Sequence, residues 1–107
     1  MQTIFPSAGG ELDLFDLAKA YAYPRERWVR ANMVTSADGA AYVEGRSTGL
    51  SGPDDKQIFG VLRVLTDMIL VGAETARVEE YKPARPRPSL ASLREALAAE
   101  GVRPFSR

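Results

Sequence analysis

Met68-Ile69-Leu70-Val71, followed by Gly72-Ala73-Glu74-Thr75, is the stretch of this 107-residue chain that decides the predicted fold. The four aliphatic residues are too few for a helix and predict a buried β-strand. Gly72 marks the turn that should follow the strand, because glycine allows a ligand to approach the backbone closely. The Thr75 hydroxyl can join the exposed N–H groups of a following helix, so the stretch predicts a phosphate-binding turn.

An earlier strand and turn are predicted to stand beside this one. Trp28 to Val34 alternates as a strand does. Ser36-Ala37-Asp38-Gly39 predicts a turn at its carboxyl end. Because ligands bind beyond the carboxyl ends of strands in open parallel sheets, we expect Ser36 and Asp38 to share a site with Gly72 and Thr75.

Helices are predicted between and around these strands. The amphipathic stretch from about Asp54 to Leu65 has Ser51 or Gly52 as its N-cap, with Pro53 at the first helical position. Such a helix between two strands makes a β-α-β unit. Further helices are predicted at Glu11 to Tyr21, over one or two turns from Thr75 toward Tyr81, and at Ser89 to Glu100 with Gly101 as its stop, while Lys82 to Pro88 is expected to be extended.

The composition excludes several classes of function. Lysine plus arginine and aspartate plus glutamate number 14 each, so no overall charge favours nucleic acid or an anionic membrane as a partner. The chain has neither cysteine nor histidine, which removes disulfides and a Ser-His-Asp triad and argues against any metal site. No apolar run approaches the roughly 20 residues needed to cross a bilayer, so we expect a cytoplasmic protein.

The two predicted strands also set an expectation about domain organisation. Residues 1–10 are expected to be a flexible leader, and residues 11–107 the N-terminal part of a larger α/β domain. Two strands leave sheet edges and faces uncovered. We therefore expect the chain either to continue past Arg107 or to pair with another polypeptide.

The two predicted turns and Arg63 also have ordinary structural interpretations. Ser36 to Gly39 can be a simple turn at the end of a strand. Gly72 to Thr75 can be a simple connection between a strand and a helix. Arg63 can compensate the dipole at the end of its helix, or its guanidinium can clamp a phosphate. These alternatives remain open at the level of the sequence.

Four motifs together resemble a known family. They are Arg30 to Gly39 (RANMVTSADG), Gly49 to Pro53 (GLSGP), Leu62-Arg63, and Ile69 to Thr75 (ILVGAET). Their order and spacing over about Trp28 to Tyr81 resemble the reductase domain of bacterial riboflavin biosynthesis. The resemblance implies a dihydrofolate-reductase-like fold, a three-layer α/β sheet with helices on both faces, present here as an incomplete domain.

The resemblance also implies an activity and a set of site residues. It implies NADPH-dependent reduction of 5-amino-6-(5-phosphoribosylamino)uracil to its ribitylamino product, in a homodimer or with a complementing C-terminal segment. The family pattern gives Gly72, Thr75, Glu79, Gly49 and Leu50 to the cofactor. It gives Ser36, Ser47, Arg63 and an arginine of the 82–88 connector to the phosphorylated substrate, and it leaves Asp38 to order the loop or the reacting sugar as the catalytic candidate.

The chain departs from the family pattern at three positions. Glu74, Ala76 and Glu79 stand where the family commonly has glycine, valine and aspartate. Two other functions also stay open. One is a pterin reductase of the same fold, and the other is a truncated, non-catalytic binding or assembly module.

Overall fold

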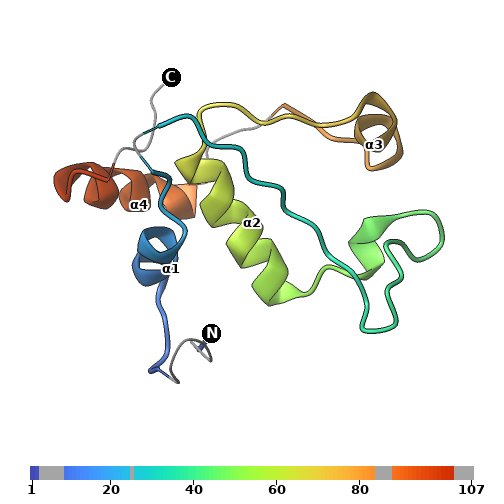
Figure 1. Cartoon of the computed structure of the whole chain (residues 1–107), viewed down its shortest axis with the longest axis horizontal. Coiled ribbons are helices and arrows are strands. Elements are labelled where there is room, and N and C mark those ends of the chain that lie inside the picture. Colours follow the sequence, from blue (N-terminus) through green and yellow to red (C-terminus); the bar gives the residue numbers. More distant parts are fainter. Residues whose placement is uncertain (3–8, 25, 84–87, 103–107) are drawn as a thin grey trace.

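The computed structural model of the chain describes residues 1–2, 9–24, 26–83 and 88–102. Its elements in chain order are α1 (Leu14–Ala20), the short 3-10 helix η1 (Ser47–Gly49), α2 (Pro53–Leu65), α3 (Ala73–Val78) and α4 (Pro88–Ala99). Helices α1, α2 and α4 gather on one side of the molecule (Figure 1). The loop with η1 and helix α3 lie on the other side.

The hydrophobic core is formed by the three helices α1, α2 and α4. Their apolar faces meet because each helix repeats small or aliphatic residues at helical spacing. Lys19 on α1 and Glu100 after α4 add an exposed ion pair of 3.5 Å across the outside of this cluster. The buried residues of the core are Leu17, Ala18, Val61, Leu65, Leu90, Leu93 and Leu97.

Helix α2 begins where the sequence predicts. Gly52 is its N-cap and Pro53 its first residue, as expected from the fixed φ of proline and its missing N–H. The Ser51 hydroxyl donates to the Asp55 carboxylate at 2.6 Å. Asp54 and Asp55 lie in the first turn, where negative charge stabilises the helix dipole.

Helices α1 and α4 also have residues at their ends that explain where they begin or stop. In α1, the Asp16 N–H donates to Asp13 at 2.8 Å and the Asp13 N–H donates back to Asp16 at 3.3 Å, which forms a capping box. This cap starts the helix at Leu14, later than the predicted Glu11. Gly101 follows α4 with φ 74°, the left-handed conformation that glycine adopts without strain, and confirms the predicted stop.

The predicted three-layer dihydrofolate-reductase-like sheet is wrong for the described residues. No named strand occurs among them, and their β-pairing is limited to two isolated bridges, Gln2 with Glu11 and Val43 with Arg46. The two segments expected to be strands, 28–34 and 68–71, are extended but unpaired. The described structure is a helical cluster with extended connections.

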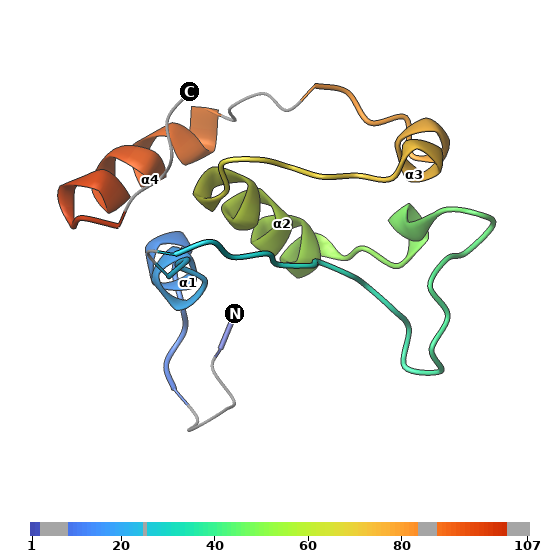
Figure 2. The same cartoon turned by 45° about the horizontal axis from the view of Figure 1, so that its top comes forward.

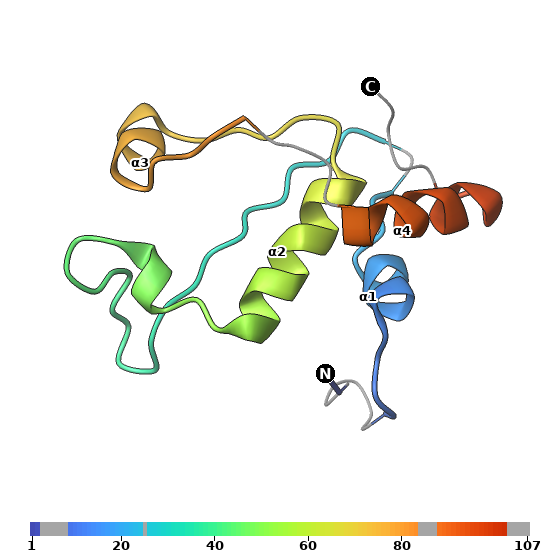
Figure 3. The ribbon, with the colours of Figure 1, turned by 180° about the vertical axis from the view of Figure 1, so that it is seen from behind.

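The two extended segments lack the partners that a strand needs. Figure 2 and Figure 3 show them running separately, one toward the loop with η1 and the other toward α3. Arg30 holds the first segment to the end of α1, because its Nη1 donates to the Tyr21 carbonyl at 2.5 Å and its guanidinium lies over the Tyr23 ring at 4.6 Å. Val29 and Leu70 are 88% and 79% exposed, so neither segment contributes these side chains to the core.

Two predicted segments lie partly outside the described residues. Residues 3–8 of the expected leader and residues 84–87 of the proline-rich connector, with Arg85 and Arg87, are not described. Pro88, predicted to end the extended connector, begins α4.

Candidate functional site

A carboxylate joins the 43–50 loop to the end of α3. Glu79, the C-cap of α3, accepts the Ser47 backbone N–H at 2.7 Å and the Ser47 hydroxyl at 2.8 Å on its Oε1. Its Oε2 accepts the Thr48 hydroxyl at 2.8 Å. Two residues predicted for different ligands, Ser47 for the substrate and Glu79 for the cofactor, are therefore in direct contact.

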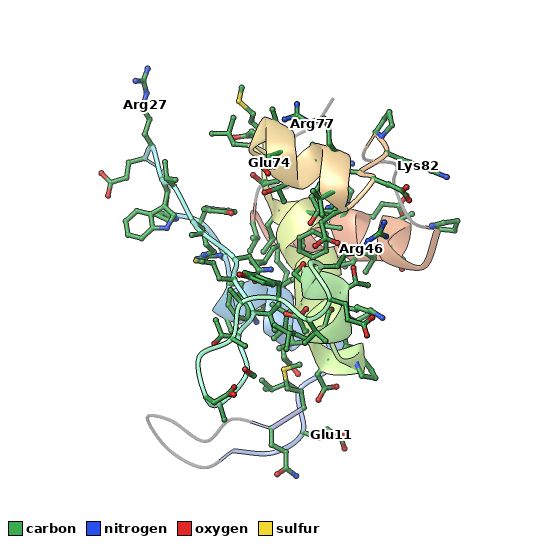
Figure 4. The ribbon with its side chains drawn as sticks, turned by 90° about the vertical axis from the view of Figure 1, so that its right-hand side faces the viewer. Glu11, Arg27, Arg46, Glu74, Arg77 and Lys82 are labelled. Carbon is green, nitrogen blue, oxygen red and sulfur yellow. The ribbon has the colours of Figure 1, made fainter. Side chains whose placement is uncertain are left out.

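These hydrogen bonds change the ionisation of Glu79. The N–H of Ser47 contributes most to lowering the pKa of the carboxyl group, followed by the hydroxyls of Thr48 and Ser47, while desolvation opposes them. The positive charge of Arg46 lowers the pKa further. Figure 4 shows Arg46 beneath α3, which carries Glu74 and Arg77. Glu79 is therefore an anion at neutral pH.

A tight turn shapes the 43–50 loop before it reaches Glu79. Val43 and Arg46 exchange backbone hydrogen bonds of 2.9 and 3.0 Å, with Glu44 and Gly45 between them at φ 51° and 78°. A Cβ on Gly49 would lie 3.3 Å from the Val43 Cβ, so a glycine suits this close approach. Leu50 follows and donates its N–H to the Ser47 carbonyl at 2.9 Å.

The predicted phosphate-binding turn stands at the start of α3. Gly72 is the N-cap of the helix and makes no side-chain cap, so the first backbone N–H groups of α3 have no capping partner from it. The Thr75 hydroxyl is 3.8 Å from the place a Cβ on Gly72 would occupy. Gly72 and Thr75 are both exposed. They are neighbours, as the sequence predicts, and a ligand can reach them.

The guanidinium of Arg63 contacts two aromatic rings. Its guanidinium carbon lies 4.5 Å from the centre of the Phe59 ring and 5.9 Å from that of Tyr81. Its Nε is buried and makes no hydrogen bond in the part of the chain that the structure describes. Buried polar groups normally have a partner, so this donor stands out as one that an acceptor could satisfy.

Ser36 and Asp38 form a turn that satisfies itself. The Ser36 hydroxyl donates to Asp38 Oδ1, and the Ala40 N–H donates to the Ser36 Oγ at 3.0 Å. The Ser36 hydroxyl lowers the pKa of Asp38 most, with the backbone N–H groups of Asp38 and Ala40 adding to the effect. Asp38 is thus an exposed carboxylate that accepts hydrogen bonds, a poor proton donor at neutral pH.

The structure brings Ser47 into contact with Glu79, and Gly72 close to Thr75. Ser36 and Asp38 bond to each other in a separate turn. Tyr81 links Arg63 to α3, because its ring faces the guanidinium and its N–H donates to the Ala76 carbonyl at 3.0 Å. Within the described residues, no hydrogen bond joins Ser36 or Asp38 to Arg63 or to the contacts of Glu79.

Sequence reasoning missed three residues of this site. Thr48 shares Glu79 with Ser47, and Phe59 and Tyr81 hold the Arg63 side chain. The spacing of Phe59 and Arg63, four residues apart on a helix, was a signal for their stacking. No local signal pointed to Tyr81 or to the pairing of Thr48 with Glu79, since both contacts bridge distant parts of the chain.

The described part of the chain shows neither a metal-binding cluster nor a membrane-spanning helix. No group of three or more acidic or other metal-ligating side chains gathers there. None of the helices in the described ranges is long and apolar enough to span a bilayer.

Comparison with known proteins gave one match. The model of a family described as the RibD C-terminal domain matches residues 27–97, more than half of the chain. No curated protein and no solved structure matches the chain. The matched range contains every candidate site residue, from Ser36 and Asp38 to Glu79 and Tyr81.

Proposed function

Because the chain belongs to the RibD C-terminal domain family, a reductase-type domain of riboflavin biosynthesis, we propose that it reduces 5-amino-6-(5-phosphoribosylamino)uracil with NADPH. The reduction adds a hydride to C1 of the opened ribose imine and a proton to the imine nitrogen, which gives the ribitylamino product. Such a reaction depends on holding two ligands in register and excluding water more than on strong acid-base groups.

The observation that carries the proposal is the buried, unpartnered Nε of Arg63. A guanidinium has five N–H donors in a planar fork that matches the oxygens of a phosphate. Stacking on Phe59 and Tyr81 restricts the side chain, so less rotamer entropy is lost when a phosphate binds. This arrangement favours the phosphate clamp over simple compensation of the helix dipole.

The residues at the start of α3 fit a phosphate of the cofactor. The Thr75 hydroxyl is an exposed donor, and Gly72 beside it has no side chain to block an incoming group. When bound, NADPH supplies the hydride. Thr75 and Gly72 would hold its phosphate, with Gly49 and Leu50 of the 43–50 loop as further contacts. Glu79 would be another contact of the cofactor, although its oxygens already accept three hydrogen bonds from the protein.

Asp38 has a supporting role in the proposed reaction. Its hydrogen bonds and lowered pKa keep it ionised, so it suits binding a sugar hydroxyl better than donating a proton. Ser36 fixes its orientation through the turn. The proton that reaches the imine nitrogen then comes from water or from the substrate itself.

The proposed function is tested by incubating the chain with NADPH and each of two substrates. We expect loss of NADPH absorbance with 5-amino-6-(5-phosphoribosylamino)uracil, with the ribitylamino product identified by mass spectrometry, and no turnover of dihydrofolate. Turnover of dihydrofolate alone would instead support a pterin reductase. Absence of turnover together with absence of NADPH binding would reject the reductase assignment for this chain.

The exposed apolar side chains favour a second candidate function, that of a binding or assembly module. Val29, Met33, Met68 and Leu70 on the two extended segments are each more than two-thirds exposed. Extended backbone without a β-bridge in the described residues is suited to pairing with strands of another chain. For this candidate we propose a second copy as the partner. Light scattering should give the mass of a dimer, and a monomer at all concentrations would reject it.

A further inference from the structure

The donors of Ser47 are fully occupied by a group of the protein itself. Serine has two donors, the backbone N–H and the hydroxyl, and Glu79 Oε1 accepts both. The neighbouring Thr48 hydroxyl donates to the other oxygen of the same carboxylate. Three hydrogen bonds from two consecutive residues therefore converge on one negative charge.

This arrangement matters for any anionic ligand that uses Ser47. Hydrogen bonds to a charged acceptor are the strong ones, so the Glu79 contact holds the loop firmly in place. A phosphate that approaches the same donors meets the carboxylate, and two anions in contact repel one another. The ligand and Glu79 thus compete for the same hydrogen bonds.

We propose that Glu79 is an autoinhibitory latch that occupies the donors of Ser47 and Thr48 until a phosphate-bearing ligand displaces it. The proposal rests on the proposed function for the role of Ser47 in binding phosphorylated substrate. Glu79 is partly exposed at the C-cap of α3, so rotation of its side chain toward solvent is the motion by which we expect the carboxylate to leave Ser47 and Thr48. Release of Glu79 removes the three hydrogen bonds that join Ser47 and Thr48 of the 43–50 loop to the end of α3.

The latch itself is tested without any ligand, by hydrogen exchange. We expect the Ser47 amide to exchange about tenfold faster or more in Glu79→Ala than in the unmodified chain, because its acceptor is gone. Glu80→Gln is the matched control, since it removes the same charge one residue away, and it should leave the exchange of Ser47 unchanged. Equal exchange of Ser47 in Glu79→Ala and in the unmodified chain would overturn the latch.

The inhibitory role is tested by titration with ribose 5-phosphate and with inorganic phosphate, followed by calorimetry. We expect Glu79→Ala to bind ribose 5-phosphate about tenfold more tightly than the unmodified chain, and Glu80→Gln to bind it within about twofold. Ser47→Ala in the Glu79→Ala background should reduce the gain, because it removes one of the three donors that Glu79 occupies. Inorganic phosphate should show the same order of affinities, which locates the effect on the phosphate group.

Two results distinguish failure of the latch from failure of the proposed function. Unchanged or weaker binding of ribose 5-phosphate by Glu79→Ala, with reductase turnover by the unmodified chain, would overturn the inhibitory role and leave the function standing. Absence of binding by every variant, with Ser47 exchange still faster in Glu79→Ala, would overturn both the inhibitory role and the assignment of Ser47 to the substrate phosphate.

Discussion

The guanidinium carbon of Arg63 lies 4.5 Å from the centre of the Phe59 ring, one helical turn earlier on α2. Tyr81 approaches the same guanidinium from beyond α3, at 5.9 Å. Two segments separated by the whole of α3 therefore restrain one cation, while its buried Nε stays without an acceptor in the described residues. An arginine placed only to compensate a helix dipole would need neither ring.

Arg63→Gln separates the two interpretations of this residue. We expect the melting temperature to change little, while kcat/KM for the phosphorylated substrate falls about tenfold for each ~1.4 kcal/mol of charge-assisted bonding that is lost. Arg77→Gln, an exposed arginine in the last turn of α3, is the matched control and should leave kcat/KM unchanged. A loss of stability of a few tenths to about 1 kcal/mol with unaltered kinetics would assign Arg63 to the helix dipole.

A dephosphorylated substrate completes this test. It should react poorly with the unmodified chain and be almost indifferent to Arg63→Gln, because the group that Arg63 recognises is missing. An equal loss on both substrates would mean that Arg63 does not bind the phosphate.

Leu97→Ala tests whether α1, α2 and α4 carry the stability of the described structure. Leu97 is 0% exposed in the core, and removing such a side chain costs about 2–5 kcal/mol. The same substitution at Leu70, which is 79% exposed on an extended segment, should cost less than about 0.5 kcal/mol. Urea unfolding of both variants gives the comparison. A large loss at Leu70 would show that another chain covers this segment in solution.

The contrast between Leu97 and Leu70 also explains which parts of the fold could be predicted from the sequence. Helix ends depend on neighbouring residues, so Gly52 with Pro53 and the stop at Gly101 were predicted correctly. A strand depends on a partner that the local sequence does not contain, and the aliphatic run around Leu70 was therefore assigned to a sheet that the described residues do not form.

The candidate site shows the same limit. The closeness of Gly72 and Thr75 follows from their spacing at the start of a helix and was predictable. The contact of Glu79 with Ser47 joins residues 32 positions apart, and it depends on how the 43–50 loop returns to α3. Such a contact comes from tertiary structure, and no pattern in the sequence indicates it.

Thr75→Val tests the proposed cofactor turn. The substitution keeps the shape of the side chain and removes its hydroxyl, so we expect a loss of about 1.5–3 kcal/mol in NADPH binding, roughly ten- to a hundredfold in Kd. Thr66→Val is the matched control, because the Thr66 hydroxyl donates to the Met68 carbonyl at 2.8 Å, away from α3. A fluorescence titration that gave the same Kd for Thr75→Val and the unmodified chain would remove Thr75 from the site.

The Glu79 carboxylate should make the contact between the 43–50 loop and α3 sensitive to acid. The hydrogen bonds from Ser47 and Thr48 lower the pKa of Glu79 in the folded chain, so the contact contributes stability above the ordinary glutamate pKa of about 4.3 and loses it as the pH falls through the lowered value. Between pH 7 and 5 we therefore expect this contact to contribute the same stability.

Carbon NMR of the Glu79 carboxyl group measures this directly. Its titration midpoint should lie below that of a glutamate in a short peptide, and the double substitution of Ser47→Ala with Thr48→Ala should raise it, even though the Ser47 N–H and the charge of Arg46 remain. The two hydroxyls lower the pKa only if they favour the ionised form, so removing them must shift the midpoint upward. A midpoint at or above the peptide value in the unmodified chain would mean that Ser47 and Thr48 do not hold Glu79 in solution.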